Sequence, residues 1–454
     1  MTILDVLPPA PAIRERTFLG EPRALGYLAF TEAWERFSYY GMTALLVLYM
    51  SQALLMPGHI EHVVGFAAFR SVVEGVFGPM STLALSSQIF GLYTGLVYFT
   101  PVLGGWVADR WIGQRNAVVL GAVLMSGGHL AMAFDASFLL ALLLLIVGCG
   151  FLKGNISTQV GGLYGENDRA GRARGFSIFS IGINVGAVAG PLLCGLLAQL
   201  YGWHAGFGLA GLLMLIGLAT YLAGYRELSA SVRGRPLAPA AAPLDRAQWG
   251  IIGALFAVMI ITMFQSIAYY QNSNVALIWI DRSVDLELFS YRVPTGWFNS
   301  IDPFVSIVAV PFLLAWWRRR ALRGSEPGEI AKMGTGAWIA CAANLLLAAG
   351  CAATDRVPIV VPIAYNVLLG VAFLYYWPTL LALVSRAAPP RVRATLMGTA
   401  FMSLFLSNVT IGRIGALFER MTPLKFWALH AAIAATGGVL ALTLGRRLER
   451  VLHG

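Results

Sequence analysis

Three ionisable side chains, Glu32, Glu35 and Arg36, lie inside the first long apolar segment of this 454-residue sequence, at about residues 25–56. A charge at bilayer depth costs roughly 2.5–3.5 kcal/mol on insertion scales, so it persists where it is paired or where it lines a wet cavity. Glu32 and Arg36 are four residues apart and therefore meet on one helix face. The spacing predicts a buried acid–base pair.

Phenols continue the same helix face. Tyr39 follows Glu35 by four residues, and Tyr40 follows Arg36 by four. The result is one stripe of acid, base and phenol that we expect to face the protein interior. Such a stripe suits the binding of a charged solute or the carrying of a proton. The alternative is a buried salt bridge that only fixes helix packing.

A second intramembrane cation, Lys153, lies in the middle of a later apolar segment. A lone ammonium there requires a carboxylate, and Glu32 or Glu35 is the expected partner. A solute with its own carboxylate would compete for Arg36 and Lys153, and the glutamates would then take up protons more readily. Arginine suits a two-pronged grip on a carboxylate, and lysine suits a movable point charge. The alternative role for Lys153 is a structural ion pair.

These groups need long helices to hold them. The chain is 58% hydrophobic and 12% charged, which is the composition of a polytopic all-α membrane protein. Apolar runs of around 20 residues meet the length needed to cross a bilayer as a helix. We expect twelve spans, at about 25–53, 82–108, 116–135, 138–161, 174–200, 206–226, 247–275, 298–317, 333–353, 358–385, 394–418 and 425–445.

The distribution of basic residues predicts the orientation. With the N-terminus placed inside, most of the 32 lysines and arginines fall in inner segments, so both termini are expected in the cytoplasm. The proline- and alanine-rich residues 228–246 read as a cytoplasmic linker. They divide the chain into six-helix halves, 1–227 and 247–454. Two equal halves indicate a transporter with its site between them at mid-membrane.

Other classes of function lack their signals. The sequence has no Ser/His/Asp set, no HExxH and no glycine-rich phosphate loop, so we do not expect an enzyme. Its four cysteines have no metal-ligand spacing, and neither a metal nor a cofactor is expected. The net charge of +10 does not indicate nucleic-acid binding, because the basic residues lie in short loops between spans.

A glycine- and charge-containing loop follows the second predicted span. Gly104 and Gly105 permit close helix contact, and Asp109 could form an ion-pair latch with Arg110 and Arg115. This segment resembles the loop signature of the major facilitator superfamily. The resemblance implies a gating and structural role for these five residues, not solute binding.

Four further motifs occur in a consistent order along the chain. Residues 32–41 (EAWERFSYYG) resemble the span-one signature of the proton-dependent oligopeptide transporter family, a branch of that superfamily with bacterial members. Residues 151–157 (FLKGNIS), 179–186 (FSIGINVG) and 297–303 (WFNSIDP) are similar to its motifs in spans four, five and eight. The resemblance implies the major facilitator superfamily fold, with twelve helices in two bundles.

The chain also departs from the family pattern. An arginine and an acid that can pair near the outer gate are replaced by Thr43 and Tyr270, and the span-ten glutamate that binds the peptide amine is replaced by Phe373. Conversely, Asp302 stands where the family has asparagine. We hypothesise that the anionic partner of the amine has moved to Asp302. The alternative is that Asp302 only caps the helix that begins near Pro303.

The expected site combines these residues. Gly91 replaces the span-two histidine of animal members, so no proton relay is expected there. Asn184 could bond a peptide amide or amine, or alternatively a neighbouring helix. Tyr93 and Tyr376 are weaker candidates to line the pocket. Proton coupling is assigned to Glu32, Glu35, Arg36, Lys153 and Asp302, and solute binding to Arg36, Tyr39, Tyr40, Lys153, Asn184, Asp302, Phe373 and Trp377.

The resemblance implies a symporter that imports di- and tripeptides by alternating access across a bacterial inner membrane. The proton gradient is its energy source, lipid and peptide are its partners, and it functions as a monomer. One alternative keeps the family but changes the solute to a non-peptide or amino acid-like charged compound. Another is a peptide sensor that does not transport.

Overall fold

The computed structural model describes residues 17–165, 168–228, 244–354 and 356–453. Regular structure in these residues is almost entirely helical. The strands are two-residue pairs in the loops: β1 (Thr17–Phe18) with β2 (Glu21–Pro22), β3 (Val284–Asp285) with β6 (Val357–Pro358), and β4 (Glu287–Leu288) with β5 (Tyr291–Arg292). The α-helices are α1 (Arg23–Tyr49), α2 (Phe66–Phe77), α3 (Thr82–Val107), α4 (Gln114–Ala131), α5 (Phe138–Gly162), α6 (Arg169–Tyr201), α7 (Trp203–Gly224), α8 (Arg246–Tyr270), α9 (Val275–Ser283), α10 (Ile301–Leu322), α11 (Glu329–Ala353), α12 (Val360–Ala387), α13 (Arg393–Gly415) and α14 (Pro423–His453).

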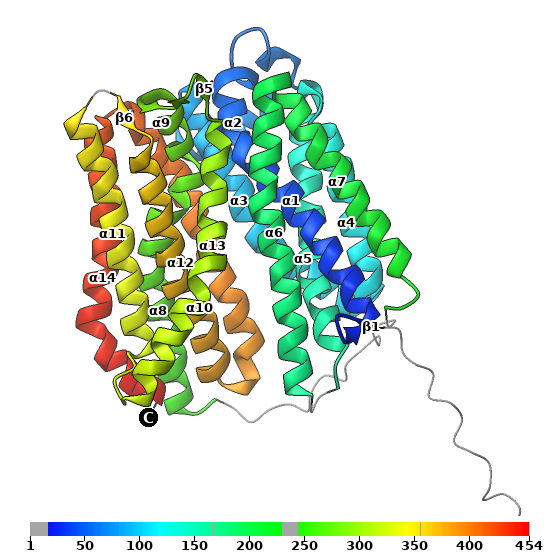
Figure 1. The fold of residues 1–454 in the computed structure, drawn as a ribbon, viewed down its shortest axis with the longest axis vertical. Helices are drawn as coiled ribbons and strands as arrows, with labels where there is room; N and C mark the ends of the chain where they lie inside the picture. The colour runs from blue at the N-terminus through cyan, green and yellow to red at the C-terminus, as the bar shows by residue number, and fades with distance from the viewer. Residues whose placement is uncertain (1–16, 166–167, 229–243, 355, 454) are drawn as a thin grey trace, which may run out of the picture.

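The long helices stand side by side in two groups (Figure 1). Helices α1 and α3–α7 form one group, and α8 and α10–α14 form the other. Short α2 and α9 lie near one end of the molecule. Most of the predicted linker, residues 229–243 of 228–246, lies outside the described residues.

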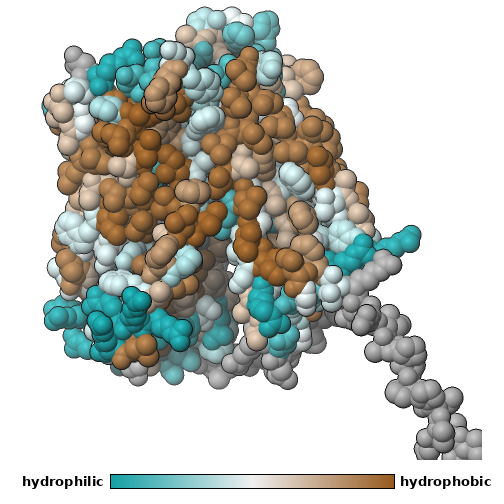
Figure 2. All heavy atoms as spheres, viewed as in Figure 1, coloured by the Kyte–Doolittle hydropathy of each residue, from teal (hydrophilic) through white to brown (hydrophobic). Residues whose placement is uncertain are grey.

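A band of apolar side chains crosses the middle of the face shown in Figure 2, between more polar ends. Ten of the described helical segments are long and apolar enough to cross a membrane. The long helices α1 and α4 are not among the ten. Helix α1 carries the charges of Glu32, Glu35 and Arg36, which reduce its apolarity, and the 18 residues of α4 begin with the polar Gln114, Arg115 and Asn116. The chain is therefore a multi-pass helical membrane protein.

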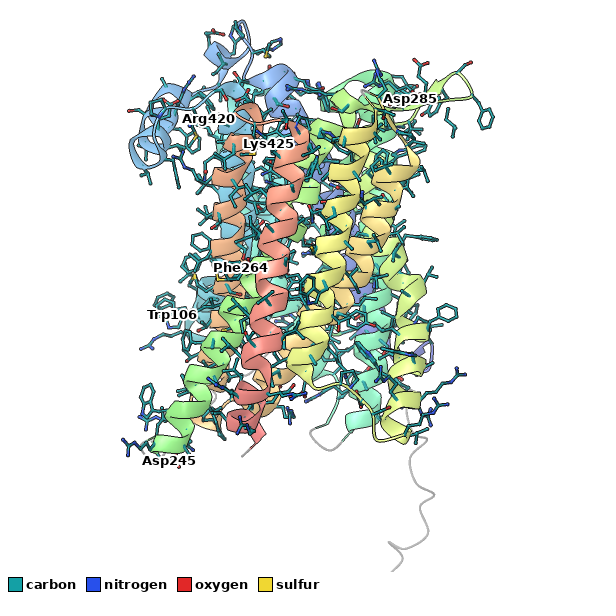
Figure 3. All side chains as sticks on the ribbon, turned by 90° about the vertical axis from the view of Figure 1, so that its left-hand side faces the viewer. Trp106, Asp245, Phe264, Asp285, Arg420 and Lys425 are labelled. Atoms are coloured by element: carbon teal, nitrogen blue, oxygen red, sulfur yellow. The ribbon has the colours of Figure 1, made fainter. Side chains whose placement is uncertain are left out.

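The two ends of the molecule differ in charge. We call the end at which α10 and α14 finish the basic end, because Arg318–Arg320 and Arg446–Arg447 lie there. Figure 3 shows Asp245 at this end, Phe264 about midway along the molecule, and Asp285 at the opposite end. The helices thus run the full depth of the apolar band.

Helix α1 packs very closely on α6, and this contact positions the charged stripe. A Cβ added at Gly182 would lie 2.7 Å from the backbone oxygen of Ala29, and one at Gly186 would lie 2.3 Å from that of Ala33. Gly190 is equally close to the Phe37 oxygen, at 2.4 Å. Glycines four residues apart let two helix backbones meet in a membrane. Residues 182–190 therefore hold α1 in register.

The predicted spans match the observed helices closely at most ends, and the short α2 lies in the segment between the first two predicted spans. The prediction missed α9, which continues from α8 after a break at residues 271–274. The predicted span 247–275 ends where α9 begins, although residues 275–280 are apolar. In the structure these residues are all buried, so tertiary packing turns the chain into a separate helix.

A carboxylate fixes the loop between α2 and α3. Oε1 of Glu74 accepts hydrogen bonds from the Met80 backbone N–H at 3.1 Å and from Nε of Arg70 at 3.0 Å. The Met80 N–H and then the Arg70 guanidinium lower the pKa of Glu74 below its ordinary value. A carboxylate with a lowered pKa stabilises the fold above its unfolded pKa, and the effect is lost as the pH falls through the folded pKa.

We therefore predict that amide hydrogen exchange around residue 80 is slower in the wild type than in a Glu74→Gln variant. The ratio of the two rates should stay constant between about pH 5 and 8. The difference between wild type and variant should disappear at strongly acidic pH, where Glu74 is protonated. Exchange measured by mass spectrometry on the segment 78–82 checks this. A difference that persists unchanged at pH 2.5 would contradict it, and α14 supplies an internal reference.

Candidate binding site between the helix groups

The charged stripe on α1 is buried, as the sequence predicts. Nε of Arg36 lies 3.1 Å from Oε1 of Glu32 and also pairs with the carboxylate of Glu35. All three side chains are at least 96% shielded from solvent. Within the described residues, Oε2 of Glu32, Oε1 of Glu35 and Nη2 of Arg36 have no hydrogen-bond partner. Buried polar atoms are normally satisfied, so this cluster can still accept a proton or a ligand.

Lys153 on α5 does not pair with a glutamate, contrary to the prediction. Its Nζ lies 4.7 Å from the centre of the Tyr98 ring, a cation–π contact, and no carboxylate of the described residues is within ion-pair distance. The reason is competition, because Arg36 on the same helix as both glutamates already holds them. Lys153 is therefore a separate cation.

A cavity of about 660 Å³ lies between the two helix groups. Its walls come from α1, α3 and α6 on one side and from α8, α10, α12 and α13 on the other. In Figure 2 the surface is hollowed between the groups toward the basic end. Among its lining residues are the predicted Tyr39, Tyr40, Asn184, Asp302, Phe373 and Trp377.

Asp302 lies at the start of α10, with its carboxylate directed across to α8. Its Oδ2 accepts a hydrogen bond from the Tyr269 hydroxyl, and the residue is 8% exposed. The capping alternative is wrong, because Ser300 occupies the N-cap position and Asp302 is already in the first turn. Phe373 stacks on the Tyr269 ring at 5.3 Å. Position 373 carries no acid, but the carboxylate of Asp302 lies close to it, because Tyr269 binds that carboxylate and Phe373 stacks on the Tyr269 ring.

Two tyrosines join the helix groups across the cavity. The hydroxyls of Tyr98 on α3 and Tyr270 on α8 are 3.1 Å apart, and their rings meet edge to face. Tyr270 replaces the acid that relatives place here, and Thr43 instead bonds the Tyr39 carbonyl of its own helix at 2.9 Å. The Tyr270 hydroxyl therefore contacts Tyr98, on whose ring Lys153 stacks, while the Thr43 hydroxyl stays on its own helix.

At the end away from the basic end, uncharged contacts among α3, α13 and Asn274, the residue before α9, close the cavity. Nδ2 of Asn274 donates to Oγ of Ser87 at 2.7 Å, and that hydroxyl donates to the Gly412 carbonyl at 3.2 Å. Oγ1 of Thr94 donates to Oδ1 of Asn408 at 3.0 Å. Thr94 and Asn408 also line the cavity, so this seam forms its roof.

Gly91 is central to this seam. A Cβ at Gly91 would lie 2.4 Å from the backbone oxygen of Asn408 and 3.0 Å from the Gly412 nitrogen. No side chain fits there while the seam is closed. The absence of a histidine at this position therefore has a structural reason, because the backbone of α13 occupies the space that a side chain would need.

The loop motif after α3 is only partly arranged as expected. A Cβ at Gly104 would meet the Gly150 carbonyl oxygen at 2.1 Å, so this glycine does permit close contact with α5, whereas nothing lies within 4 Å of Gly105. The ion-pair latch is absent: within the described residues, no ion pair joins Asp109 to Arg110 or Arg115. Nη1 of Arg115 instead donates to the Tyr225 carbonyl at 3.4 Å, and its guanidinium lies 4.1 Å from that ring.

Asn184 bonds its own helix, since its Nδ2 donates to the Ser180 carbonyl at 2.9 Å. The predicted alternative of an interhelical bond therefore does not occur, and Oδ1 of Asn184 is available to a solute. Trp377 meets Phe401 edge to face and lines the cavity. Tyr93 and Tyr376 are buried away from it, and Tyr376 bonds Ser266 at 3.0 Å.

Sequence reasoning missed several polar residues of the cavity. Tyr98 and Tyr269 carry the contacts to Lys153 and Asp302, and Thr94 and Asn408 form the roof. A signal existed, because each is a polar side chain within an apolar span, but such residues also bond within helices. Within the described residues, no group of three or more His, Cys, Asp or Glu side chains is arranged to hold a metal ion.

Comparison with known proteins agrees with this geometry. The peptide transporter YePEPT of Yersinia enterocolitica is 28% identical, over 94% of this chain and 95% of that protein. A di-/tripeptide transporter of Lactococcus lactis subsp. cremoris is 26% identical, over 96% and 98%. A crystal structure of a peptide transporter POT with sulfate superposes with a TM-score of 0.85 at 24% identity, covering 97% of this chain and 98% of that one.

These similarities extend over nearly the whole chain, and the shared fold is a helical transporter fold, not that of an enzyme. A sequence profile described as the POT family matches residues 115–235 and 245–428. This match covers more than half of the chain and is independent of the motif at residues 32–41. The chain therefore belongs to the POT family, the proton-dependent oligopeptide transporters that its ordered motifs resemble.

Proposed function

We propose that this protein is a proton-coupled symporter that imports di- and tripeptides by alternating access. The observation that carries the proposal is the cavity, which has Asp302 in one wall and two cations directly behind the other. Arg36 lies 5.3 Å from the centre of the Tyr39 ring and Lys153 lies 4.7 Å from that of Tyr98, and both tyrosines line the cavity. Arg36 and Lys153 belong to α1 and α5, and Asp302 belongs to α10. A peptide zwitterion presents a carboxylate and an ammonium, and it fits between groups of opposite charge.

Several parts of the proposal concern the architecture. We propose twelve spans, obtained by adding α1 and α4 to the ten apolar segments, in two bundles comprising residues 1–227 and 247–454. The basic end then faces the cytoplasm of a bacterial inner membrane, by the positive-inside rule, and both termini lie there. The proton gradient supplies the energy, no cofactor is used, and the working unit is a monomer.

The coupling follows from competition at the α1 cluster. Arg36 holds both Glu32 and Glu35 behind the cavity wall that Tyr39 and Tyr40 form. A peptide carboxylate that attracts Arg36 would weaken these pairs, and a carboxylate that loses its cation binds a proton more readily. Proton and peptide would thus bind together. Glu32 and Glu35 are the proposed proton carriers, and Asp302 is the corresponding acid in the other half.

The direct test is uptake of labelled dialanine into proteoliposomes, with and without an inwardly directed proton gradient. We expect uptake that depends on the gradient and is abolished by a proton ionophore. Uptake that is absent, or equal without the gradient, would contradict the proposal. Glu35→Gln provides the coupling control, because it should retain exchange of peptide but lose gradient-driven accumulation.

One observation favours a second candidate, an amino acid-like or other non-peptide charged solute. Phe373 makes the wall of the cavity near α12 apolar where peptide-binding relatives carry a glutamate. A panel of dipeptides, single amino acids and small anions, each competing against labelled dialanine, separates the two candidates. Competition by dipeptides alone supports the first.

The role of Asp302 gives a further prediction. Asp302→Asn preserves shape and the contact with Tyr269 but removes the charge, and a charge-assisted hydrogen bond contributes about 1.5–3 kcal/mol. We expect KM for dialanine to rise roughly tenfold or more, with a smaller change in kcat. Tyr269→Phe is the matched control, because it keeps the carboxylate and should change KM less. Wild-type KM in Asp302→Asn would eliminate this role.

A further inference from the structure

Helix α10 presents an apolar groove to the membrane. Of its side chains only that of Asp302 is buried, and Phe312 is 73% exposed. The groove has a volume of about 570 Å³ and runs between α10 and α12. Val308, Phe312 and Trp316 line it on one side, and Val367, Val371 and Tyr375 line it on the other. An apolar surface hollow in this band of the protein is suited to a hydrocarbon chain.

Exposed arginines lie directly beyond the groove. On a helix of 3.6 residues per turn, side chains seven residues apart share a face. Arg319 therefore lies below Phe312, and Arg323 lies below Trp316. Both arginines are exposed, and within the described part of the chain neither has a carboxylate partner. A second hollow, of about 520 Å³, is lined by Leu314, Ala315, Arg318, Arg319 and Leu322 and continues to this end.

The length of the groove matches one leaflet. Its lining on α10 extends from Phe304 to Trp316, which is about 18 Å at 1.5 Å per residue. Half of a hydrocarbon core of about 30 Å is about 15 Å. A lipid of the leaflet at the basic end would therefore place its acyl chain in the groove and its phosphate beside the guanidiniums.

We propose that this groove is a binding site for an anionic phospholipid. One acyl chain lies between α10 and α12, and the headgroup phosphate pairs with Arg319 and Arg323. The stacking of the Arg320 guanidinium over the Trp316 ring, at 5.2 Å, places a third cation at the same depth. Charge complementarity favours an anionic lipid over a zwitterionic one. A zwitterionic headgroup would bring its own cation toward these arginines, which repel it.

The site adjoins the transport cavity through one helix. Leu374 of α12 lines both the groove and the central cavity, and α10 carries Asp302 on its cavity side. A lipid in the groove packs on the back of the helix that bears this carboxylate. The site is nevertheless independent of the solute, and binding is measurable without transport.

Arginines at this end of a membrane protein are expected in general, so the test needs a matched cluster without a groove. Arg446 and Arg447 on α14 provide it, because they are exposed at the same end and line neither of the two hollows. Ala309→Trp addresses the groove itself, since Ala309 is one of its lining residues.

The experiment is native mass spectrometry of the full-length protein in detergent, titrated with phosphatidylglycerol or with phosphatidylcholine of identical acyl chains. We expect the wild type to retain phosphatidylglycerol at least tenfold more strongly. Arg319→Gln with Arg323→Gln should lose this preference, and Ala309→Trp should weaken binding of both lipids. Arg446→Gln with Arg447→Gln should bind as the wild type does.

Equal retention of the two lipids by the wild type would overturn the proposal. It would also be overturned if Arg319→Gln with Arg323→Gln and Arg446→Gln with Arg447→Gln lost phosphatidylglycerol binding equally. If glycerol 3-phosphate, which has no acyl chain, displaced phosphatidylglycerol, the site would bind a soluble phosphate. That result would also overturn the proposal. Thermal unfolding in the same detergent shows that each variant is folded. Arg319→Lys with Arg323→Lys keeps the charge and should retain binding of phosphatidylglycerol.

Discussion

Arg36→Gln is expected to abolish gradient-driven uptake and to destabilise the protein. Arg36 lies between Glu32 and Glu35, and all three are buried. Removing one member of a buried ion pair costs about 3–5 kcal/mol, because it leaves an uncompensated charge. The two carboxylates would then have no cation for a solute to compete for, so proton binding would no longer respond to the solute. Uptake of dialanine and the midpoint of thermal unfolding measure the two effects.

The chain contains a matched control for this change. Arg70 and Glu74 form the same kind of pair, four residues apart on α2, but with 40% and 24% of their side chains exposed. Exposed pairs of this kind contribute about 0.2–1 kcal/mol, so Arg70→Gln should leave uptake nearly unchanged. Arg36→Lys keeps the charge and should retain part of the stability. Normal accumulation of peptide by Arg36→Gln would contradict the proposed coupling.

Gly91→Ala is expected to prevent closure of the roof over the cavity and thereby to stop uptake. The new Cβ would lie 2.4 Å from a backbone oxygen of Asn408, an atom that cannot rotate away. Helices α3 and α13 must separate to accommodate it, and the state closed at the end opposite the basic end is lost. Because transport requires both states, we expect at least a tenfold loss of uptake with the fold retained.

The state of the roof can be measured directly. A cysteine introduced at Thr94, which belongs to the roof and lines the cavity, should react with an impermeant maleimide from the end opposite the basic end when Gly91→Ala is present but not when it is absent. Gly253→Ala on α8 is the control, because nothing lies within 4 Å of a Cβ there. Equal labelling with and without Gly91→Ala would show that the seam does not control access.

The sequence alone determined the class of protein and most of its helices, because membrane burial imposes long apolar segments whatever the fold. It also determined the α1 cluster: Glu32 and Arg36 are four residues apart, and helix geometry brings them together without tertiary information. The family followed from ordered motifs, of which EAWERFSYYG carries the charges. The short α9 was missed because the predicted span 247–275 ends where it begins, and its 9 residues are too few to cross a bilayer as a helix.

The contacts between segments distant in sequence could be decided only by the tertiary structure. It paired Asp302 with Tyr269 rather than with its own helix end, and it placed Lys153 on Tyr98 because Arg36 already holds both glutamates. It also showed that Gly91, the position of the missing histidine, lies where the backbones of α3 and α13 come close together. Spacing along a helix fixes which side chains share a face, but only packing fixes what that face meets.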